Sequence, residues 1–262
     1  MSTAERNITV IKVGGNVIDD PEALDRLVED LARMEGPRIL IHGGGKEATR
    51  LSEKLEIPTT MINGRRVTDA ATIDVVTMVY AGLINKRIVA KLQAAGANAI
   101  GLCGADGNVI PAKRRPAEPI DFGFVGDIDP QYINTGLIAT MLDAGIIPVF
   151  CAICHDGRGS LLNCNADSVA SAVAVAVSKI GPTNLTFCFE MPGVMTDVDD
   201  PESLIPTITP EYYDKLRADG IVTKGMIPKI DNAFAAIGSG VGSVRICRSD
   251  NLAGTTGTII TA

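Results

Sequence analysis

The sequence has 262 residues, of which 46% are hydrophobic and 21% are charged, and its net charge is −7. This length and apolar content suffice to bury a sizeable core, and they exclude a disordered chain. The acidic balance opposes nucleic-acid binding, because a phosphate backbone requires a basic surface. The densest basic run, K-R-R at residues 113–115, is short and lies close to prolines, so we interpret it as a solvated loop. We expect no nucleic-acid partner.

The first residues, M-S-T-A-E-R-N, lack the basic and then apolar segments of a signal peptide. A membrane-spanning helix needs about 18 or more apolar residues in a row. The most apolar segment, residues 135–154, is interrupted by Asp143, Gly145 and Pro148. We therefore expect a cytoplasmic protein that makes no contact with a membrane.

Most of the cysteines lie within apolar segments, which in a reducing compartment indicates buried thiols. The C-x-x-C pair of Cys151 and Cys154, followed by His155, imitates part of a zinc site. Zinc sites usually pair two such motifs, whereas these residues lie on strand-like sequence. We therefore predict no metal site made by the protein itself.

The predicted elements begin with a β-rich run at residues 8–13, which ends in Lys12 and the glycine pair Gly14 and Gly15. A strand followed by a lysine and paired glycines is a candidate phosphate-binding turn, although a lysine at a strand end is often only solvated. Pro21 suits a first helical turn, with Asp19 or Asp20 as the cap. Together with the next strand, this predicts a βαβ unit with parallel strands.

Residues 38–47, R-I-L-I-H-G-G-G-K-E, join that next strand to a helix start. Glycine lets the main chain approach a ligand closely, and a helix N-terminus favours an anion. A tight turn without a ligand is the simpler interpretation, but three consecutive glycines exceed what such a turn needs. We predict an anion site here, followed by a helix over residues 46–55.

Asn63 and Gly64 predict a β-hairpin between apolar flanks, and two arginines, Arg65 and Arg66, follow them directly. The planar fork of arginine suits a carboxylate, although a hairpin arginine is more often merely solvated. Thr68 is then expected to cap a long helix over residues 69–95. The apolar periodicity of this helix fits a sheet-covering helix or a subunit interface.

The middle of the chain continues the alternation of strands and helices. A strand is predicted over residues 97–102, a flexible hairpin or lid over 108–128, a helix over 131–144 and a strand over 146–150. The motif L-L-N-C-N-A-D, residues 161–167, then leads into a helix over 168–180. Asn163 and Asn165 should share one side of an extended segment. Asp167 is expected to cap the helix.

The last part predicts a strand over residues 185–189 ending at Glu190, and a helix over 211–218. A further helix starts within Gly225-Met226-Ile227-Pro228-Lys229, and strands follow over residues 240–247 and at the end of the chain. The alternation argues for an α/β protein, a three-layer α/β/α sandwich with a mainly parallel central sheet.

Seven short motifs occur in a specific order along the chain. They are K-V-G-G-N from Lys12, H-G-G-G from His42, N-G-R-R-V-T from Asn63, N-K from Asn85, F-V-G from Phe124, N-C-N-A-D from Asn163 and G-M-I-P-K from Gly225. In this order they resemble the acetylglutamate kinase branch of the amino acid kinase family. The resemblance extends from about residue 8 to the closing G-T-T-G-T-I-I.

The resemblance implies one amino acid kinase domain over residues 1–262. An N-terminal lobe, about 1–180, would bind the acyl-amino acid and form the dimer, and a C-terminal lobe, about 181–262, would bind the nucleotide. The implied reaction transfers the γ-phosphoryl group of ATP to the side-chain carboxylate of N-acetyl-L-glutamate, in arginine biosynthesis, and Mg²⁺ arrives with the nucleotide. A carboxylate with a pKa of about 4.3 is already ionised, so no general base is needed.

The resemblance also implies the roles of individual residues. Lys12 and Lys229 would clamp the transferring phosphoryl group, and Asp167 would hold both ammonium groups. Residues implied to bind the substrate are Gly44 and Gly45 through backbone N–H groups, Arg66 through the α-carboxylate and Asn163 through the acylamido region. Residues implied on the nucleotide side are Gly14, Gly15, Glu190, Gly225 and Met226.

The sequence departs from the family pattern in two places. Glu190 stands where the family usually has an aspartate in T-D-x-x-G-V, and Lys224 stands where many members have a glycine. In addition, the first strand begins near residue 8, without the N-terminal helix by which arginine-inhibited hexamers interlock. We therefore expect a homodimer without arginine feedback through that device.

Three alternatives remain open at this point. N-succinyl-L-glutamate is a second candidate acceptor, with Arg65 as a candidate cation for its extra carboxylate. A sister kinase of glutamate, aspartate, carbamate or a nucleoside monophosphate is opposed by the N-G-R-R-V-T and N-C-N-A-D motifs. A non-catalytic nucleotide-binding protein is opposed by the joint presence of Lys12, Asp167 and Lys229.

Overall fold

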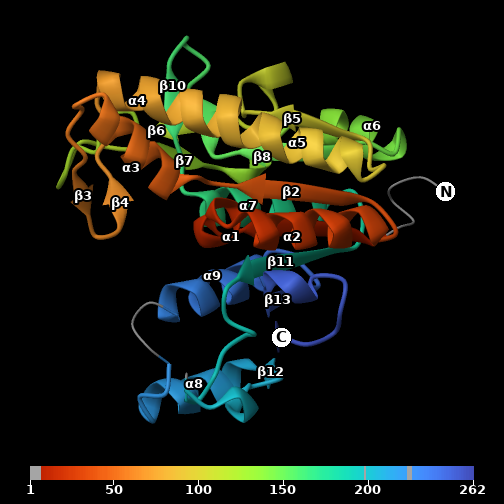
Figure 1. Ribbon diagram of the computed structural model, residues 1–262. Helices are drawn as coiled ribbons and strands as arrows, with labels where there is room; N and C mark the ends of the chain where they lie inside the picture. Colours follow the sequence, from red (N-terminus) through yellow and green to blue (C-terminus); the bar gives the residue numbers. More distant parts are fainter. Residues whose placement is uncertain (1–6, 198, 223–225) are drawn as a thin grey trace.

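The computed structural model describes residues 7–197, 199–222 and 226–262. An eight-stranded sheet has the order β12-β14-β13-β11-β1-β2-β8-β5, with helices on both of its faces (Figure 1). Its strands are β1 (Ile8–Val13), β2 (Arg38–His42), β5 (Ala99–Leu102), β8 (Ile147–Cys151), β11 (Thr183–Phe189), β12 (Thr207–Ile208), β13 (Ser243–Arg248) and β14 (Thr258–Ile260). Every neighbouring pair is parallel except β13 and β14. The predicted α/β/α fold is confirmed.

The principal helices cover this sheet and join its strands. They are α1 (Gly15–Asp19), α2 (Pro21–Arg33), α3 (Gly45–Lys54), α4 (Ala70–Thr77), the π-helix η2 (Met78–Ile84), α5 (Asn85–Ala94), α6 (Thr135–Asp143), α7 (Ala166–Val177), α8 (Pro210–Ala218) and α9 (Ile227–Gly238). Short 3₁₀ turns are η3 (Asp106–Asn108), η4 (Pro130–Tyr132), η5 (Pro201–Ser203) and η6 (Ser249–Asn251).

In the described part of the chain, three small antiparallel pairs of strands lie beside the main sheet. They are β3 (Met61–Ile62) with β4 (Arg65–Arg66), β6 (Ala112–Arg114) with β7 (Gly126–Ile128), and β9 (Ile153–His155) with β10 (Leu161–Asn163). Asn63 and Gly64 both have positive φ, 49° and 76°, as a tight two-residue hairpin turn requires. The hairpin predicted from the Asn-Gly pair is therefore confirmed.

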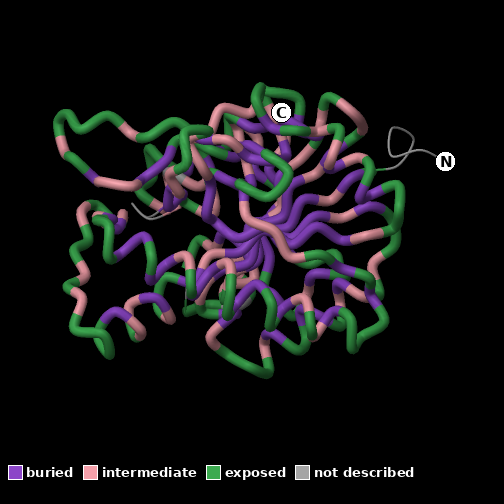
Figure 2. The backbone as a smooth tube through the Cα atoms, turned by 90° about the horizontal axis from the view of Figure 1, so that it is seen from above, coloured by how far each residue is buried: buried purple, intermediate pink, exposed green. Residues whose placement is uncertain are grey.

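The core lies along the central strands, which are the buried middle of Figure 2. Strands β1, β2 and β8 carry continuous apolar runs because helices cover both of their faces. Lys12 is the charged exception on β1, and its residue is only 8% exposed. A buried ammonium group needs a partner, so its position near the strand end already indicates a polar site there.

The long helix predicted over residues 69–95 is present, but its middle is π-helical. α4, η2 and α5 follow one another without a break, and Asp69 accepts a hydrogen bond from the Thr72 amide at 2.8 Å. The sequence analysis expected Thr68 to cap this helix, but the cap is Asp69. π-Helical turns within α-helices often mark functional positions, because they change which side chains share a face.

Two further predictions are corrected by the structure. The helix predicted from residue 131 begins at Thr135, because Asn134 accepts from the Leu137 amide and caps it there. Lys113 and Arg114 lie on β6 and not in a loop, and Arg115 pairs with Asp127.

The cysteines are all free, and every one is buried except the half-exposed Cys103. The prediction of buried thiols is confirmed, and burial raises the pKa of Cys151 to about 12. Among the residues that the structure describes, no group of three or more His, Cys, Asp and Glu side chains is placed to hold a metal ion. Within that same part of the chain, no helix has both the length and the apolar character that crossing a membrane demands.

Candidate active site

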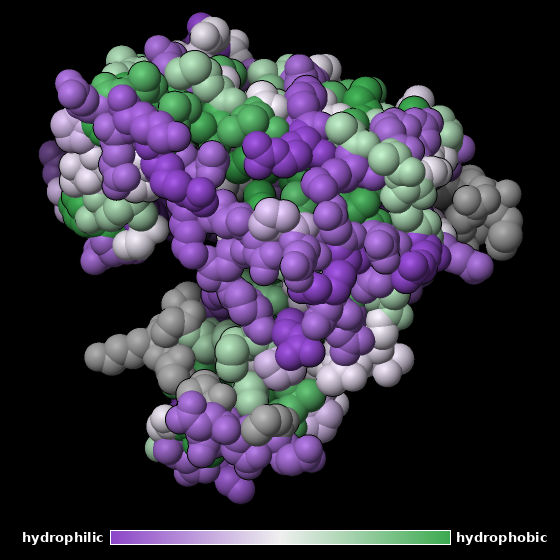
Figure 3. Space-filling view, in the orientation of Figure 1, coloured by the Kyte–Doolittle hydropathy of each residue, from purple (hydrophilic) through white to green (hydrophobic). Residues whose placement is uncertain are grey.

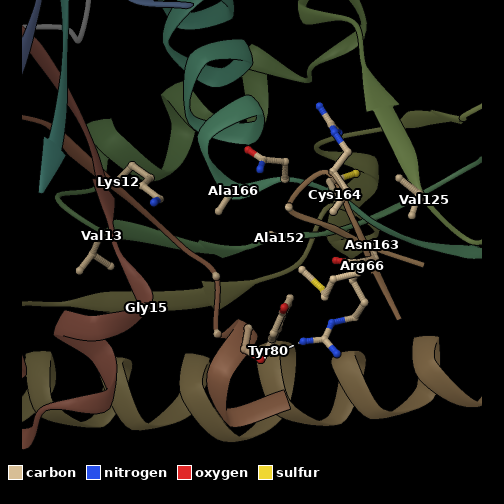
Figure 4. A pocket seen from close by; sticks show the side chains of 17 residues that line it. Lys12, Val13, Gly15, Arg66, Tyr80, Val125, Ala152, Asn163, Cys164 and Ala166 are labelled. Carbon is tan, nitrogen blue, oxygen red and sulfur yellow. Dashed lines mark hydrogen bonds between the residues drawn. The ribbon is translucent and has the colours of Figure 1, made fainter. Parts of the chain in front are cut away.

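A cavity of about 240 Å³ lies beyond the carboxyl ends of β1 and β2 (Figure 4). Ligands of open α/β sheets bind at this edge, because the loops that follow parallel strands meet there. The cavity is lined by Lys12, Val13, Gly15, Gly43, Gly44, Gly45, Met61, Gly64, Arg65, Arg66, Tyr80, Val125, Ala152, Asn163, Cys164, Asn165 and Ala166. Residues far apart in the sequence thus share one hollow.

Lys12 and Asp167 form an ion pair at one side of this cavity. The distance from Lys12 Nζ to Asp167 Oδ1 is 2.7 Å, and the Lys12 side chain is 10% exposed. The sequence analysis expected Asp167 to cap its helix, but the cap of α7 is Asn165, whose Oδ1 accepts from the Ser168 amide at 3.0 Å. The Asp167 carboxylate therefore remains available to hold the lysine.

Lys229, from the first turn of α9, joins the same cluster. Its Nζ lies 3.4 Å from the centroid of the Phe189 ring, and Lys12 Nζ lies 5.1 Å from that centroid. Burial lowers the pKa of Lys229, and the nearby positive charge of Lys12 lowers it as well. The negative charges of Asp167 and Glu190 raise it. The two lysines predicted from opposite ends of the sequence are therefore neighbours around one carboxylate.

Phe189 was not found by the sequence analysis. Lys12 is registered opposite Phe187 across the parallel pair β1 and β11, and Phe189 lies two residues further along β11 on the same face. Its ring packs against both ammonium groups as a cation–π partner. The sequence signal was the position of Phe189 directly before Glu190, but only the pairing of β1 with β11 gives that position its meaning.

The glycine loop between β2 and α3, residues 43–45, lines the cavity. A Cβ on Gly44 would lie 2.3 Å from Ile84 Cδ1 and 3.0 Å from a Tyr80 ring carbon. Glycine is therefore required at residue 44, because the loop rests on η2. The predicted substrate-binding glycines Gly44 and Gly45 both line the cavity.

An alanine at residue 44 is expected to lower the free energy of unfolding by about 1–3 kcal/mol, the usual cost of overpacking a filled site. Chemical denaturation of Gly44→Ala measures this. Gly238→Ala is the matched control, because no atom lies within 4 Å of a Cβ at that exposed helical position. Equal stability of the two variants would contradict the packing argument.

Arg66 is buried at the other side of the cavity and has only uncharged partners. Its Nη2 donates to Gly45 O at 2.9 Å and to Thr49 Oγ1 at 2.8 Å, and its Nη1 donates to Thr59 Oγ1 at 3.2 Å. Among the ion pairs of the described residues, none includes Arg66. A buried guanidinium group without a carboxylate is a ready site for a ligand carboxylate.

Asn163 and Tyr80 complete this side of the cavity. Asn163 Nδ2 donates to Thr68 Oγ1 at 3.1 Å, which leaves its side-chain oxygen for other contacts. Tyr80 was missed by the sequence analysis, because at residue 80 it looks like one more apolar position of a long helix. Figure 4 shows its ring beside Arg66, and burial raises the pKa of its hydroxyl, an effect that Arg66 opposes.

Of the predicted nucleotide-side residues that the structure describes, only Gly15 lines the cavity. Gly15 lines the cavity, whereas the Gly14 amide already donates to Cys188 O at 3.0 Å. Glu190 is exposed next to Phe189, and Met226 directly precedes α9. Gly225, like Lys224, lies outside the described residues.

His42 is fully buried at the end of β2, and burial lowers the pKa of its imidazole from 6.5 to about 4. The unfolded chain takes up a proton below about pH 6.5, whereas the folded protein does not until about pH 4. Stability is therefore lost as the pH falls through this range, by about 3 kcal/mol between pH 7 and pH 4.

Urea denaturation of the wild-type protein and of His42→Asn, which carries no titrating group at this position, measures that loss. The carboxylates titrate in both proteins, so the difference between the two pH curves isolates His42. Parallel curves would contradict the assignment.

A mainly parallel α/β sheet whose strand ends gather two lysines, a carboxylate and a glycine loop defines a phosphotransferase. The chain belongs to the amino acid kinase family, whose model matches residues 7–248. It is 47% identical to the acetylglutamate kinase of Phocaeicola vulgatus over 256 residues, which cover 98% of this chain and 99% of that protein. The identity with the acetylglutamate kinase of Cytophaga hutchinsonii is 50%, covering 94% and 93% of the two chains. A solved structure of a Streptococcus mutans protein is similar with a TM-score of 0.77 and 30% identity, covering 97% and 98%.

Proposed function

We propose that this protein transfers the γ-phosphoryl group of ATP to the side-chain carboxylate of N-acetyl-L-glutamate, giving N-acetyl-L-glutamyl 5-phosphate for arginine biosynthesis. The observation that carries the proposal is the division of charge within one cavity. The buried, carboxylate-free Arg66 stands at one side, and the Lys12–Asp167 pair stands at the other. An acceptor with two carboxylates fits this division: Arg66 would hold one, and the other would face the lysines.

The reaction requires one anion to approach another. A side-chain carboxylate oxygen attacks the γ-phosphorus, the bond from that phosphorus to the β,γ-bridging oxygen breaks, and its electron pair leaves with ADP. The acceptor is ionised at neutral pH, so the catalyst supplies positive charge and alignment, not a base. Lys12 and Lys229 would stabilise the negative charge on the transferring group, and Asp167 would hold them in place.

The substrate-binding roles follow from the cavity. The N–H groups of Gly44 and Gly45 would donate to the acceptor or transferring oxygens, and Asn163 would contact the acylamido group. Gly15, Glu190, Gly225 and Met226 would lie on the nucleotide side, where Gly14 would support the turn that carries Gly15. Asp167 is already paired with Lys12, so Mg²⁺ would be held mainly by the phosphate oxygens of ATP, whose charge it screens.

We further propose two lobes, about residues 1–180 for the acyl-amino acid and about 181–262 for the nucleotide. Seen as in Figure 1, the surface is hollowed between the part that carries β3 and β4 and the part that carries α8 and α9 (Figure 3). We place the protein in the cytoplasm, where ATP and the precursors of amino acids are available.

A homodimer is proposed from the exposed apolar side chains along the α4, η2 and α5 rod and the edge strand β5. Met78, Leu83 and Ile100 are 52%, 44% and 39% exposed. Exposed apolar residues close together mark candidate interfaces. Light scattering should give twice the 27.5 kDa chain mass, and Leu83→Glu should reduce it to that of one chain. A wild-type monomer or a hexamer would contradict the proposal.

Hydroxylamine trapping tests the reaction, because an acyl phosphate reacts with hydroxylamine to form a hydroxamate. MgATP would be supplied with N-acetyl-L-glutamate, N-succinyl-L-glutamate or L-glutamate in parallel. We expect hydroxamate with N-acetyl-L-glutamate. Hydroxamate formed only with another acceptor would replace the proposed substrate. If none of the three acceptors gave ATP-dependent hydroxamate, the proposed reaction would be rejected.

A further inference from the structure

The glycine loop has a support that the proposed reaction does not yet explain, formed by His42 and Asn85. Neither side chain lines the cavity, and both are fully buried. His42 is the last residue of β2, directly before Gly43, and Asn85 is the first residue of α5, where the π-helix ends. Both side chains therefore lie next to the glycine loop but outside the cavity.

The hydrogen bonds around Asn85 determine where the proton of His42 lies. Asn85 Nδ2 donates to Val149 O at 2.9 Å, and a carbonyl oxygen can only accept, so this atom is the amide nitrogen. The same nitrogen lies 3.0 Å from His42 Nε2, which must therefore accept its second hydrogen. Lys86 Nζ contacts Asn85 Oδ1 at 3.1 Å, which agrees with this assignment.

It follows that the imidazole proton is on Nδ1. His42 Nδ1 lies 2.8 Å from Gly43 O and donates to it. The neutral form is favoured, because burial and the nearby Lys86 both oppose protonation of the ring. The order of the hydrogen bonds is then Asn85 to His42 and His42 to Gly43, with every donor matched to an acceptor.

This order of hydrogen bonds fixes the orientation of the peptide group between Gly43 and Gly44, which the two glycines by themselves leave free to rotate. The Gly43 carbonyl and the Gly44 N–H belong to one planar trans peptide and point in opposite directions. A carbonyl held toward His42 therefore turns the Gly44 N–H away from the ring. Among the described residues, this N–H has no hydrogen-bond acceptor, and Gly44 lines the cavity.

The other two carbonyl groups of the loop are held as well. Gly44 O accepts from the Ala48 amide at 3.0 Å, and Gly45 O accepts from Arg66 Nη2 at 2.9 Å and from Thr49 Oγ1 at 3.0 Å. Glycine has the greatest backbone freedom of any residue, so an unsupported loop would lose alignment. The bond from His42 is the one that sets the peptide between Gly43 and Gly44.

We propose that His42, held in its Nδ1–H form by Asn85, is a positioning residue that directs the Gly44 N–H toward the oxygens of the reacting groups. This inference rests on the proposed function, because the donor matters for the phosphoryl-transfer step. The position of the proton on His42, which is the structural part of the proposal, does not depend on any substrate. A misaligned donor costs turnover more than binding, since its hydrogen bond strengthens as charge develops in the transition state.

The proton position is tested first, in the wild-type protein. The chain contains two histidines, and Nδ1 of His155 accepts from the Gly157 amide at 3.2 Å, so this atom carries no proton, whereas Nδ1 of His42 does. Two-bond ¹H–¹⁵N correlation spectra at about pH 8 distinguish these forms. We expect Nδ1–H for His42, the signal that disappears in His42→Asn, and Nε2–H for His155. Nε2–H at His42 would overturn the proposal.

Kinetics with MgATP and N-acetyl-L-glutamate then test the consequence. Asparagine places an amide donor near the position of Nδ1, whereas glutamine extends to that of Nε2. We expect kcat of His42→Asn within about threefold of wild type, kcat of His42→Gln about 10- to 100-fold lower, and both KM values within about threefold. Equal kcat values in the two variants would indicate a purely structural role and overturn the proposal.

Asn85→Leu provides a second variant that leaves His42 in place. It removes the donor to Nε2, so the His42 signal should move toward Nε2–H and kcat should fall as in His42→Gln. An unchanged kcat beside a changed tautomer would overturn the link between the ring and the loop. If the wild-type protein does not turn over N-acetyl-L-glutamate, the proposed function fails, whereas the spectra still decide the position of the proton.

Discussion

Replacement of Lys12 by methionine is expected to lower kcat by about three orders of magnitude, with KM values changed by less than about tenfold. Removing one preorganised group that stabilises transition-state charge typically costs a factor of about 10²–10³, and cationic groups in phosphoryl transfer reach about 10³–10⁵. Lys12 Nζ is held 2.7 Å from Asp167, so its charge is already in place before the reaction. Steady-state rates with MgATP and N-acetyl-L-glutamate measure the effect.

The fold should survive this change. After loss of the lysine, the Asp167 carboxylate remains in the first turn of α7, near the positive end of the helix dipole and near Lys229. Lys54→Met, at an exposed position of α3, is the matched control and should retain wild-type kcat. A Lys12→Met enzyme within tenfold of wild-type turnover would reject the proposed role.

Lys229→Met should have a similar effect, and the double variant should be little worse than either single one. The two lysines share Asp167 and Phe189, so they act on the same charge, and groups that act as a unit are not additive. Fully additive losses would indicate that they serve separate steps.

Replacement of Arg66 by methionine is expected to raise KM for N-acetyl-L-glutamate by about 100-fold, while KM for ATP changes little. The guanidinium is buried among neutral acceptors, and a paired carboxylate would contribute about 1.5–3 kcal/mol through charge-assisted hydrogen bonds. Some loss of kcat is expected as well, because Arg66 also holds the Gly45 carbonyl. Arg66→Lys should recover little, since an ammonium group lacks the planar fork.

A change in the substrate separates these two effects. The α-amide of N-acetyl-L-glutamate keeps the reacting carboxylate but removes the charge that Arg66 would bind. The wild-type enzyme should lose about as much kcat/KM with this amide as Arg66→Met loses with the acid, and Arg66→Met should hardly distinguish the two acceptors. Arg33→Met, on the exposed face of α2, is the control. Equal discrimination by wild type and Arg66→Met would mean that Arg66 binds another group.

The sequence by itself determined the fold class and suggested most of the components of the candidate site. Apolar runs such as residues 8–13, the helix between them and the glycine turns specify parallel strands, because their periodicity and turn chemistry are local properties. The order of the motifs then identified Lys12, Asp167, Lys229, Gly44 and Arg66 as one set. In the structure, Lys12, Gly44 and Arg66 line one cavity, Asp167 pairs with Lys12, and Lys229 lies near both of these charges.

Only the tertiary structure decided which neighbours these residues have. The sequence analysis expected Asp167 to cap α7, but Asn165 is the cap. Phe189 lies near Lys12 because β11 pairs with β1. Tyr80 and Asn85 lie on a helix whose π-helical turn decides which side chains meet Gly44 and His42. Gly44 and Tyr80 are 36 positions apart, and His42 and Asn85 are 43 apart, so no local pattern encodes these contacts. They follow from how the sheet and its helices pack.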